Sequence, residues 1–169
     1  MQLIGCFSRY GDATPIATVE LRDMDAVERH VTLPTNLDEA WELLTRPDDQ
    51  AGWLGAEVQL DPTEGAGGLV VEQDGTRRRL VVDRVDAGQR LAWHWWIDGE
   101  DPSAASEVEI TLAPTGEGTL VTVVERPLAS ASASASGSSA QASAAAGEAW
   151  SHRLLHLEAL LLIAAAVRG

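Results

Sequence analysis

The run Trp93-His94-Trp95-Trp96 is the part of this chain whose residue types most clearly suggest binding chemistry. It holds half of the chain's six tryptophans. In a β-strand, Trp93 and Trp95 face one side, and His94 and Trp96 face the other. Two indoles on one face either fill a bulky core or line a pocket for an apolar or aromatic ligand. Trp96 would then be exposed or would contact another chain, which leaves a homodimer open.

The other reactive side chains form no recognisable catalytic or metal site. His152 and His156 have a spacing that can chelate a metal, but no third ligand is evident, so we expect a solvated helix face. Cys6 has no base near it in sequence, and a single cysteine excludes an internal disulfide. Phosphate-binding glycine loops and the G-x-S-x-G motif are absent. We therefore expect neither a metal nor a cofactor.

Composition indicates one soluble domain. The chain has 169 residues, 26 acidic against 12 basic, and a formal net charge of −14. This balance disfavours nucleic acid and anionic membranes as partners, and its simplest role is solubility. The longest apolar stretch, residues 154–167, is interrupted by His156 and Glu158 and predicts no membrane insertion. With no signal peptide apparent, we expect a cytoplasmic protein.

Two short helices are expected near the start of the domain. Asn36, with Glu39 three residues later, has the spacing of a capping box. Pro47 must end the first helix, because it cannot donate a backbone hydrogen bond and restrains the residue before it. Residues 48–53 then predict a second short helix.

A long helix is expected at the end of the chain. Residues 147–167 carry an apolar stripe that begins at Trp150 and Leu154 with helical spacing. Residues 129–146 before it are almost entirely Ser and Ala, which indicates a flexible or weakly helical loop. We assign 24–169 to a single domain and 1–23 to a leader of uncertain structure.

Between these helices the pattern predicts β-strands joined by short turns. Turn-forming glycines recur about every ten residues. Short turns join neighbours into an antiparallel meander, and a sheet with one apolar face needs a helix to cover it. We therefore predict an α+β fold in which a curved seven-stranded antiparallel sheet packs against the C-terminal helix. The expected strands are 28–33, 56–60, 68–73, 78–85, 90–97, 106–113 and 118–126.

This arrangement resembles the helix-grip fold of the START-like SRPBCC superfamily. In detail it resembles the homologues of the C-terminal domain of the heat-shock-protein-90 ATPase activator, over residues 27–160. The Ser/Ala tract enlarges the loop before the last helix, and the activator's N-terminal domain has no counterpart. The residues that carry the resemblance are Ala40-Trp41-Glu42-Leu43-Leu44-Thr45, Trp53, Gly67-Gly68, Val85, Arg90-Leu91, Trp93, Gly118-Thr119, Val121, Val123, Trp150, Leu154 and Leu157.

The resemblance also predicts which way the Glu125 side chain points. The family-like register points Val121, Val123 and Glu125 inward. An inward carboxylate is costly unless it is paired or hydrogen-bonded. Glu125 could therefore anchor a ligand or act as a general base. Alternatively, the strand end is exposed, or Glu125 pairs with an arginine such as Arg84.

Three functions remain open. The first is binding of a small hydrophobic or aromatic ligand between the sheet and the C-terminal helix, without catalysis. The second, which the superfamily implies, is a polyketide cyclase or aromatase reaction with Glu125 as the base. The third, which the family name implies, is an interaction with a chaperone. The residues expected to line the ligand cavity are Trp53, Leu69, Val71, Val82, Trp93, Trp95, Ile110, Val123, Glu125, Trp150 and Leu154.

Overall fold

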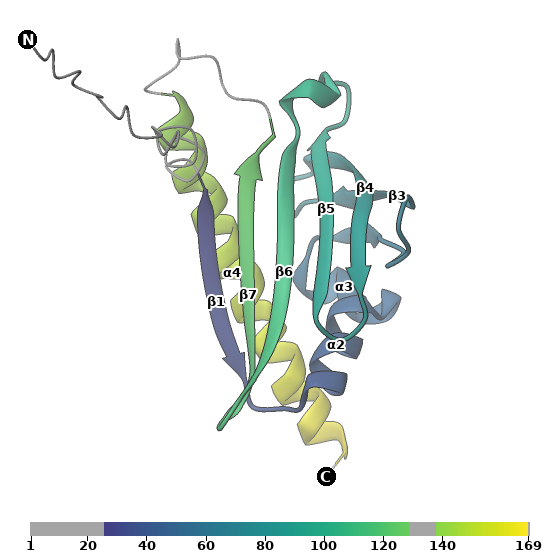
Figure 1. Ribbon diagram of the computed structural model, residues 1–169, viewed down its shortest axis with the longest axis vertical. Coiled ribbons are helices and arrows are strands. Elements are labelled where there is room, and N and C mark those ends of the chain that lie inside the picture. The colour runs from purple at the N-terminus through teal and green to yellow at the C-terminus, as the bar shows by residue number, and fades with distance from the viewer. Residues whose placement is uncertain (1–25, 129–137, 169) are drawn as a thin grey trace, which may run out of the picture.

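The computed structural model describes residues 26–128 and 138–168 (Figure 1). The leader 1–23 and Cys6 lie outside these residues. Two short helices follow the first strand, six strands follow them, and a long helix ends the chain. The elements are β1 (Val27–Leu33), α2 (Leu37–Thr45), α3 (Pro47–Trp53), β2 (Glu57–Gln59), β3 (Gly67–Val71), β4 (Arg77–Asp86), β5 (Arg90–Ile97), the 3-10 turn η1 (Pro102–Ala104), β6 (Ser106–Thr115), β7 (Gly118–Pro127) and α4 (Ser138–Arg168).

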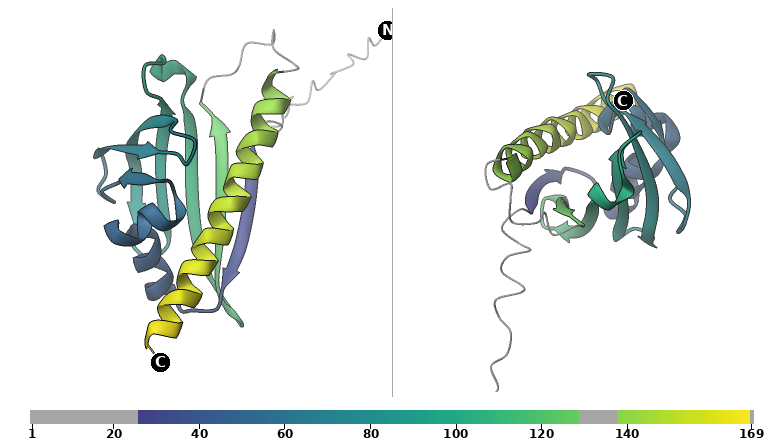
Figure 2. Two further views of the ribbon diagram at one scale, coloured as in Figure 1. Left: turned by 180° about the vertical axis from the view of Figure 1, so that it is seen from behind. Right: turned by 90° about the horizontal axis from the view of Figure 1, so that it is seen from above.

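The seven strands form one antiparallel sheet in the order β1-β7-β6-β5-β4-β3-β2. All neighbours from β2 to β7 are consecutive in the chain, as in a meander, and β1 joins the far edge beside β7. The sheet curls, and α4 runs diagonally across its concave side close to β1 (Figure 2). This architecture confirms the predicted helix-grip fold.

The two short helices begin and end where local chemistry directs. The Asn36 side chain accepts a hydrogen bond from the backbone N–H of Glu39 at 2.9 Å and caps α2. The helix ends at Thr45, one residue before Arg46, whose extended backbone suits a residue that precedes proline. Pro47 then occupies the first turn of α3, where its missing N–H costs nothing.

Helix α4 is longer than the sequence predicted. It begins at Ser138 rather than near Gly147, so residues 138–146 of the expected Ser/Ala loop are helical. Alanine has the highest intrinsic helix propensity, and an extension of an existing helix needs no new nucleus. Residues 129–137 of that loop lie outside the described residues.

The added length makes α4 long enough to be considered as a membrane-spanning helix. Residues 141–167 form a helix long and apolar enough to cross a membrane by length and composition. The apolar stretch identified in the sequence, residues 154–167, is shorter than this apolar helix. However, one side of α4 packs on the sheet through Trp150, Leu154 and Leu157, which are all buried. It is therefore the core helix of the domain.

Candidate ligand-binding site

The space between the sheet and α4 is occupied by tryptophans. Trp93 and Trp95 point inward from β5, as predicted, and meet Trp150 from α4; each of the three is at most 1% exposed. The ring centroids of Trp93 and Trp95 are 6.0 Å apart, and those of Trp95 and Trp150 are 5.7 Å apart. These are direct aromatic contacts, so the three indoles pack against one another.

Glu125 joins these rings. Its side chain points inward from β7 and is only 8% exposed. The indole N–H of Trp95 donates to one carboxylate oxygen at 2.9 Å, and that of Trp150 donates to the other at 2.6 Å. We call Trp93, Trp95, Trp150 and Glu125 the interior cluster. Since both oxygens already accept hydrogen bonds, the geometry of Glu125 favours a structural role over that of a free base.

The proposed pairing of Glu125 with Arg84 is wrong. Arg84 lies on the exposed face of β4 and donates to Asp86 at 2.8 Å. Arg84 pairs with Ala92 of β5, and the β4–β5 register shifts between Val82 and Arg84. Glu125 therefore accepts hydrogen bonds from two indoles and does not pair with Arg84.

The remaining predicted lining residues divide into two groups. Val82, Ile110, Val123 and Leu154 are buried in the core beside the interior cluster. Leu69 and Val71 are not. Gly68 pairs with inward-facing Leu80 in β3–β4, so alternation turns Val70 inward and its two neighbours outward. The run of apolar residues in β3 gave no alternation from which this register could be derived.

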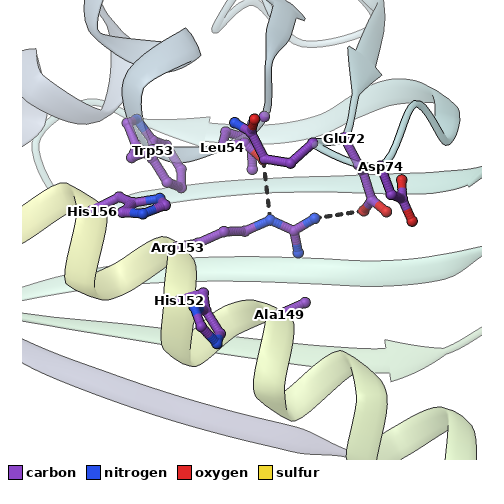
Figure 3. Close-up of a pocket in the computed structure, with 10 residues that line it drawn as sticks. Trp53, Leu54, Glu72, Asp74, Ala149, His152, Arg153 and His156 are labelled. Atoms are coloured by element: carbon purple, nitrogen blue, oxygen red, sulfur yellow. Dashed lines mark hydrogen bonds and ion pairs between the residues drawn. The ribbon is translucent and has the colours of Figure 1, made fainter.

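An open pocket of about 310 Å³ lies at one end of the interior, between α3, the β3–β4 turn and α4. Figure 3 shows its side chains, which come from residues 53–74 and from α4. Trp53 lies in its wall. We call this site the mouth pocket; it is lined by Trp53, Leu54, Gly55, Glu72, Gln73, Asp74, Ala149, His152, Arg153 and His156.

Arg153 is the central polar residue of the mouth pocket, and the sequence did not reveal it. The side chain extends from α4 and the residue is only 9% exposed. Its Nε donates to the carbonyl oxygen of Leu54 at 3.1 Å, and its Nη2 donates to Glu72 at 2.5 Å (Figure 3). The guanidinium carbon lies 4.7 Å from the ring centroid of Trp150, which is within cation–π range.

A second arginine shares the same carboxylate. Arg78 donates from Nε to Glu72 at 2.9 Å and lies 4.9 Å from the ring centroid of Trp95. Its neighbours Arg77 and Arg79 are exposed. Arg78 differs from both, because its register with Val70 places it on the inner face.

Burial affects the pKa of Arg153. Desolvation lowers the pKa of its guanidinium, and the nearby Glu72 and Glu125 carboxylates oppose that shift. Since an ordinary arginine titrates far above neutral pH, Arg153 remains charged. Arg78 and Arg153 share Glu72, and Glu125 lies near Arg153, so the formal charges of these four side chains balance.

The two histidines of α4 lie at the rim of the mouth pocket. His152 and His156 are exposed, as expected, yet both line the pocket beside Arg153. Among residues 26–128 and 138–168, no group of three or more His, Cys, Asp or Glu side chains could hold a metal ion.

Two buried indole nitrogens lack acceptors in the described part of the chain. They belong to Trp93, in the interior cluster, and to Trp53, in the wall of the mouth pocket. An unpaired buried donor is costly.

His94 and Trp96 stack on the outer face of β5, with ring centroids 5.8 Å apart, and His94 contacts Asp83 at 2.8 Å. Trp96 is half-buried there.

Solved structures share this fold. DynU16, a protein of the dynemicin biosynthetic locus, is 28% identical with a TM-score of 0.69; the match covers 81% of this chain but only 47% of DynU16. CalU16 from Micromonospora echinospora is 22% identical with a TM-score of 0.60, over 80% of this chain and 74% of that one. The Aha1 dimer from Colwellia psychrerythraea is 14% identical with a TM-score of 0.65, over 80% and 95%.

The family comparison agrees with the structural comparisons, although the search of curated proteins found no match. The profile of the family described as "Activator of Hsp90 ATPase homolog 1-like protein" matches residues 34–161, which include both short helices, the sheet from β2 to β7 and most of α4. The chain therefore belongs to this family and has the START-like SRPBCC helix-grip fold.

Proposed function

We propose that this protein binds a small, mainly apolar molecule in the mouth pocket without catalysing a reaction. The observation that carries the proposal is the combination of an open cavity of about 310 Å³ with a buried guanidinium beside it. Ligand sites in proteins are typically concave and largely apolar, with a few fixed polar groups. Trp53, Leu54 and Ala149 would supply the apolar wall, and Arg153 the polar anchor.

The mouth pocket replaces the deeper cavity expected from the sequence. The predicted lining residues Trp93, Trp95 and Trp150 pack against one another, so they support the site from below rather than surround the ligand. Their proposed role is to hold Arg153, whose guanidinium lies over the indoles of Trp95 and Trp150. Of the predicted residues, Trp53 would touch the ligand directly.

Ligand-observed NMR with 1-tetralone, a small bicyclic ketone, tests this function. We expect saturable binding at one site. Ala149→Phe, which fills the pocket, should weaken binding about tenfold or more. Ala159→Phe is the matched control, because Ala159 is exposed on the same helix and does not line the mouth pocket. Absence of saturable binding, or equal binding by both variants, would overturn the proposal.

We also propose that two copies pair through the outer face of α4. Leu155, Leu162 and Ile163 are 58–61% exposed there, and Val167 is more exposed still. Large apolar patches on a surface commonly mark interaction sites. An antiparallel pairing centred on Ala159 places Leu155 of one copy opposite Ile163 of the other. The Colwellia psychrerythraea relative was solved as a dimer.

Analytical ultracentrifugation tests the pairing. The unaltered chain should sediment as a dimer, and Leu162→Gln should shift it toward monomer. The matched control, Leu128→Gln, alters an exposed leucine outside α4 and should leave the dimer intact. A monomer at all concentrations would refute the pairing.

We also propose two alternative functions, contact with a chaperone and a cyclase-like reaction. Family membership supports contact with a chaperone ATPase, and an unchanged ATPase rate on addition of the protein would remove that role. A cyclase-like reaction with Glu125 as base would be removed by unchanged turnover in Glu125→Gln. A cytoplasmic location fits the acidic composition and is likewise proposed.

A further inference from the structure

The guanidinium of Arg153 has one end without a protein partner. Its Nε and Nη2 are engaged by Leu54 and Glu72, whereas no described residue accepts a hydrogen bond from Nη1. In Figure 3, this third nitrogen lies on the side of the guanidinium that carries no dashed line. A ligand acceptor at Nη1 would therefore add a hydrogen bond that no described residue supplies.

The charges around this donor favour an uncharged acceptor. Glu72 and Glu125 already balance Arg153 and Arg78. Asp74 adds a further carboxylate to the pocket wall. A ligand carboxylate would bring another negative charge beside Glu72 and Asp74, whereas a ketone or amide oxygen would not.

The walls favour a flat ligand. Trp53 contributes an indole, and His152 and His156 contribute imidazoles from the α4 side; Figure 3 shows the three rings around Arg153. Aromatic rings prefer to stack on, or meet edge-on, another ring. The cavity of about 310 Å³ limits the guest to a small ring system.

We infer, on the basis of the proposed mouth pocket, that the ligand is an uncharged aromatic molecule that presents a carbonyl-type oxygen to Nη1 of Arg153. Arg153 is then the residue that selects the ligand. Trp95 and Trp150 position its guanidinium, and Glu72 holds its other end.

Three probes with the same bicyclic ring system test the inference by ligand-observed NMR: 1-tetralone, tetralin and tetralin-1-carboxylate. The ketone should bind about tenfold more tightly than tetralin, which corresponds to one good hydrogen bond. The carboxylate should bind less tightly than the ketone. In Arg153→Met, the preference for the ketone over tetralin should fall to about twofold or less.

Controls separate the outcomes. Arg84→Met makes the same substitution on the exposed face of β4 and should keep the full ketone preference.

If no probe binds, the proposed function itself fails. If ketone and tetralin bind equally, the pocket stands but the selection by Arg153 is wrong. If the carboxylate binds most tightly, the site selects anions, and the uncharged ligand class is wrong. If Arg153→Met retains the preference, another group supplies the donor.

Discussion

The interior cluster and the mouth pocket use the same kinds of residue in opposite ways. In the interior cluster, the indole N–H groups of Trp95 and Trp150 donate to the two oxygens of Glu125, and the indole N–H of Trp93 has no acceptor among the described residues. In the mouth pocket, the indole N–H of Trp53 and Nη1 of Arg153 have no acceptor among the described residues. The unpaired donor of the interior cluster is enclosed by rings in direct contact and is not exposed to solvent. A region with surplus donors beside an open cavity is suited to a guest.

The two regions are also connected. The guanidinium of Arg153 lies 4.7 Å from the ring centroid of Trp150 and 5.2 Å from that of Trp95. The mouth pocket therefore rests on the interior cluster, and a change in the cluster can move the residue proposed to read the ligand.

Removal of an interior indole should have the largest effect. Trp93 contacts the other two rings of the cluster, so Trp93→Ala should destabilise the protein by about 3–5 kcal/mol. Urea denaturation measures this change. If the cluster is a packed core, free indole should raise the unfolding midpoint of the variant but not of the unaltered protein. A loss below about 1 kcal/mol would show that the interior is not closely packed.

The next largest effect is expected at Glu125. Glu125→Gln replaces one acceptor with a donor that faces an indole N–H, which should cost about 2–3 kcal/mol. The control Glu107→Gln lies on the outer face of β6 and should cost no more than about 0.5 kcal/mol. Equal costs at the two sites would remove the distinction between a satisfied interior and a tolerant surface.

Glu72 should matter more for stability than Arg153. Glu72→Gln leaves two arginines without their shared carboxylate and should cost about 2 kcal/mol. Arg153→Met should cost about 1 kcal/mol, because Arg78 still pairs with Glu72 and the Met side chain still covers the indoles. Urea midpoints measure both. A larger loss for Arg153→Met would make that residue primarily structural.

The smallest effect compares one ring from each region. Trp150→Phe removes a hydrogen bond to Glu125, whereas Trp53→Phe removes an N–H that has no acceptor among the described residues. Trp53→Phe should therefore be less destabilising by about 1 kcal/mol. Equal losses would mean that the indole of Trp53 is satisfied in solution.

The elements of the fold could be predicted because their signals are local. Strand β5 and the break at Pro47 lie where the sequence places them, since alternation and proline geometry act over a few residues. Strand β3 shows the limit: an unbroken apolar run carries no face assignment, so Leu69 and Val71 were given the wrong side. The early start of α4 was missed because its Ser/Ala composition resembles a linker.

The candidate site depended on contacts between distant residues. The inward direction of Glu125 followed from the family register, but its two indole partners lie 25 and 30 residues away in sequence. Arg153 contacts Leu54 and Glu72 across 99 and 81 residues. Within α4 it follows Trp150 and precedes Leu154 on the apolar side. A charged residue at such a position is a signal that could have identified it.

The fixed geometry of the interior cluster gives the protein an optical signature of its own. Trp93 and Trp95 are inclined at 76°, and Trp95 and Trp150 at 26°, with ring centroids no more than 6.0 Å apart. Chromophores held this close and at fixed angles give near-ultraviolet circular dichroism, which is lost when side-chain packing loosens. Because Arg153 lies over two of these rings, occupation of the mouth pocket should change that spectrum without any added label.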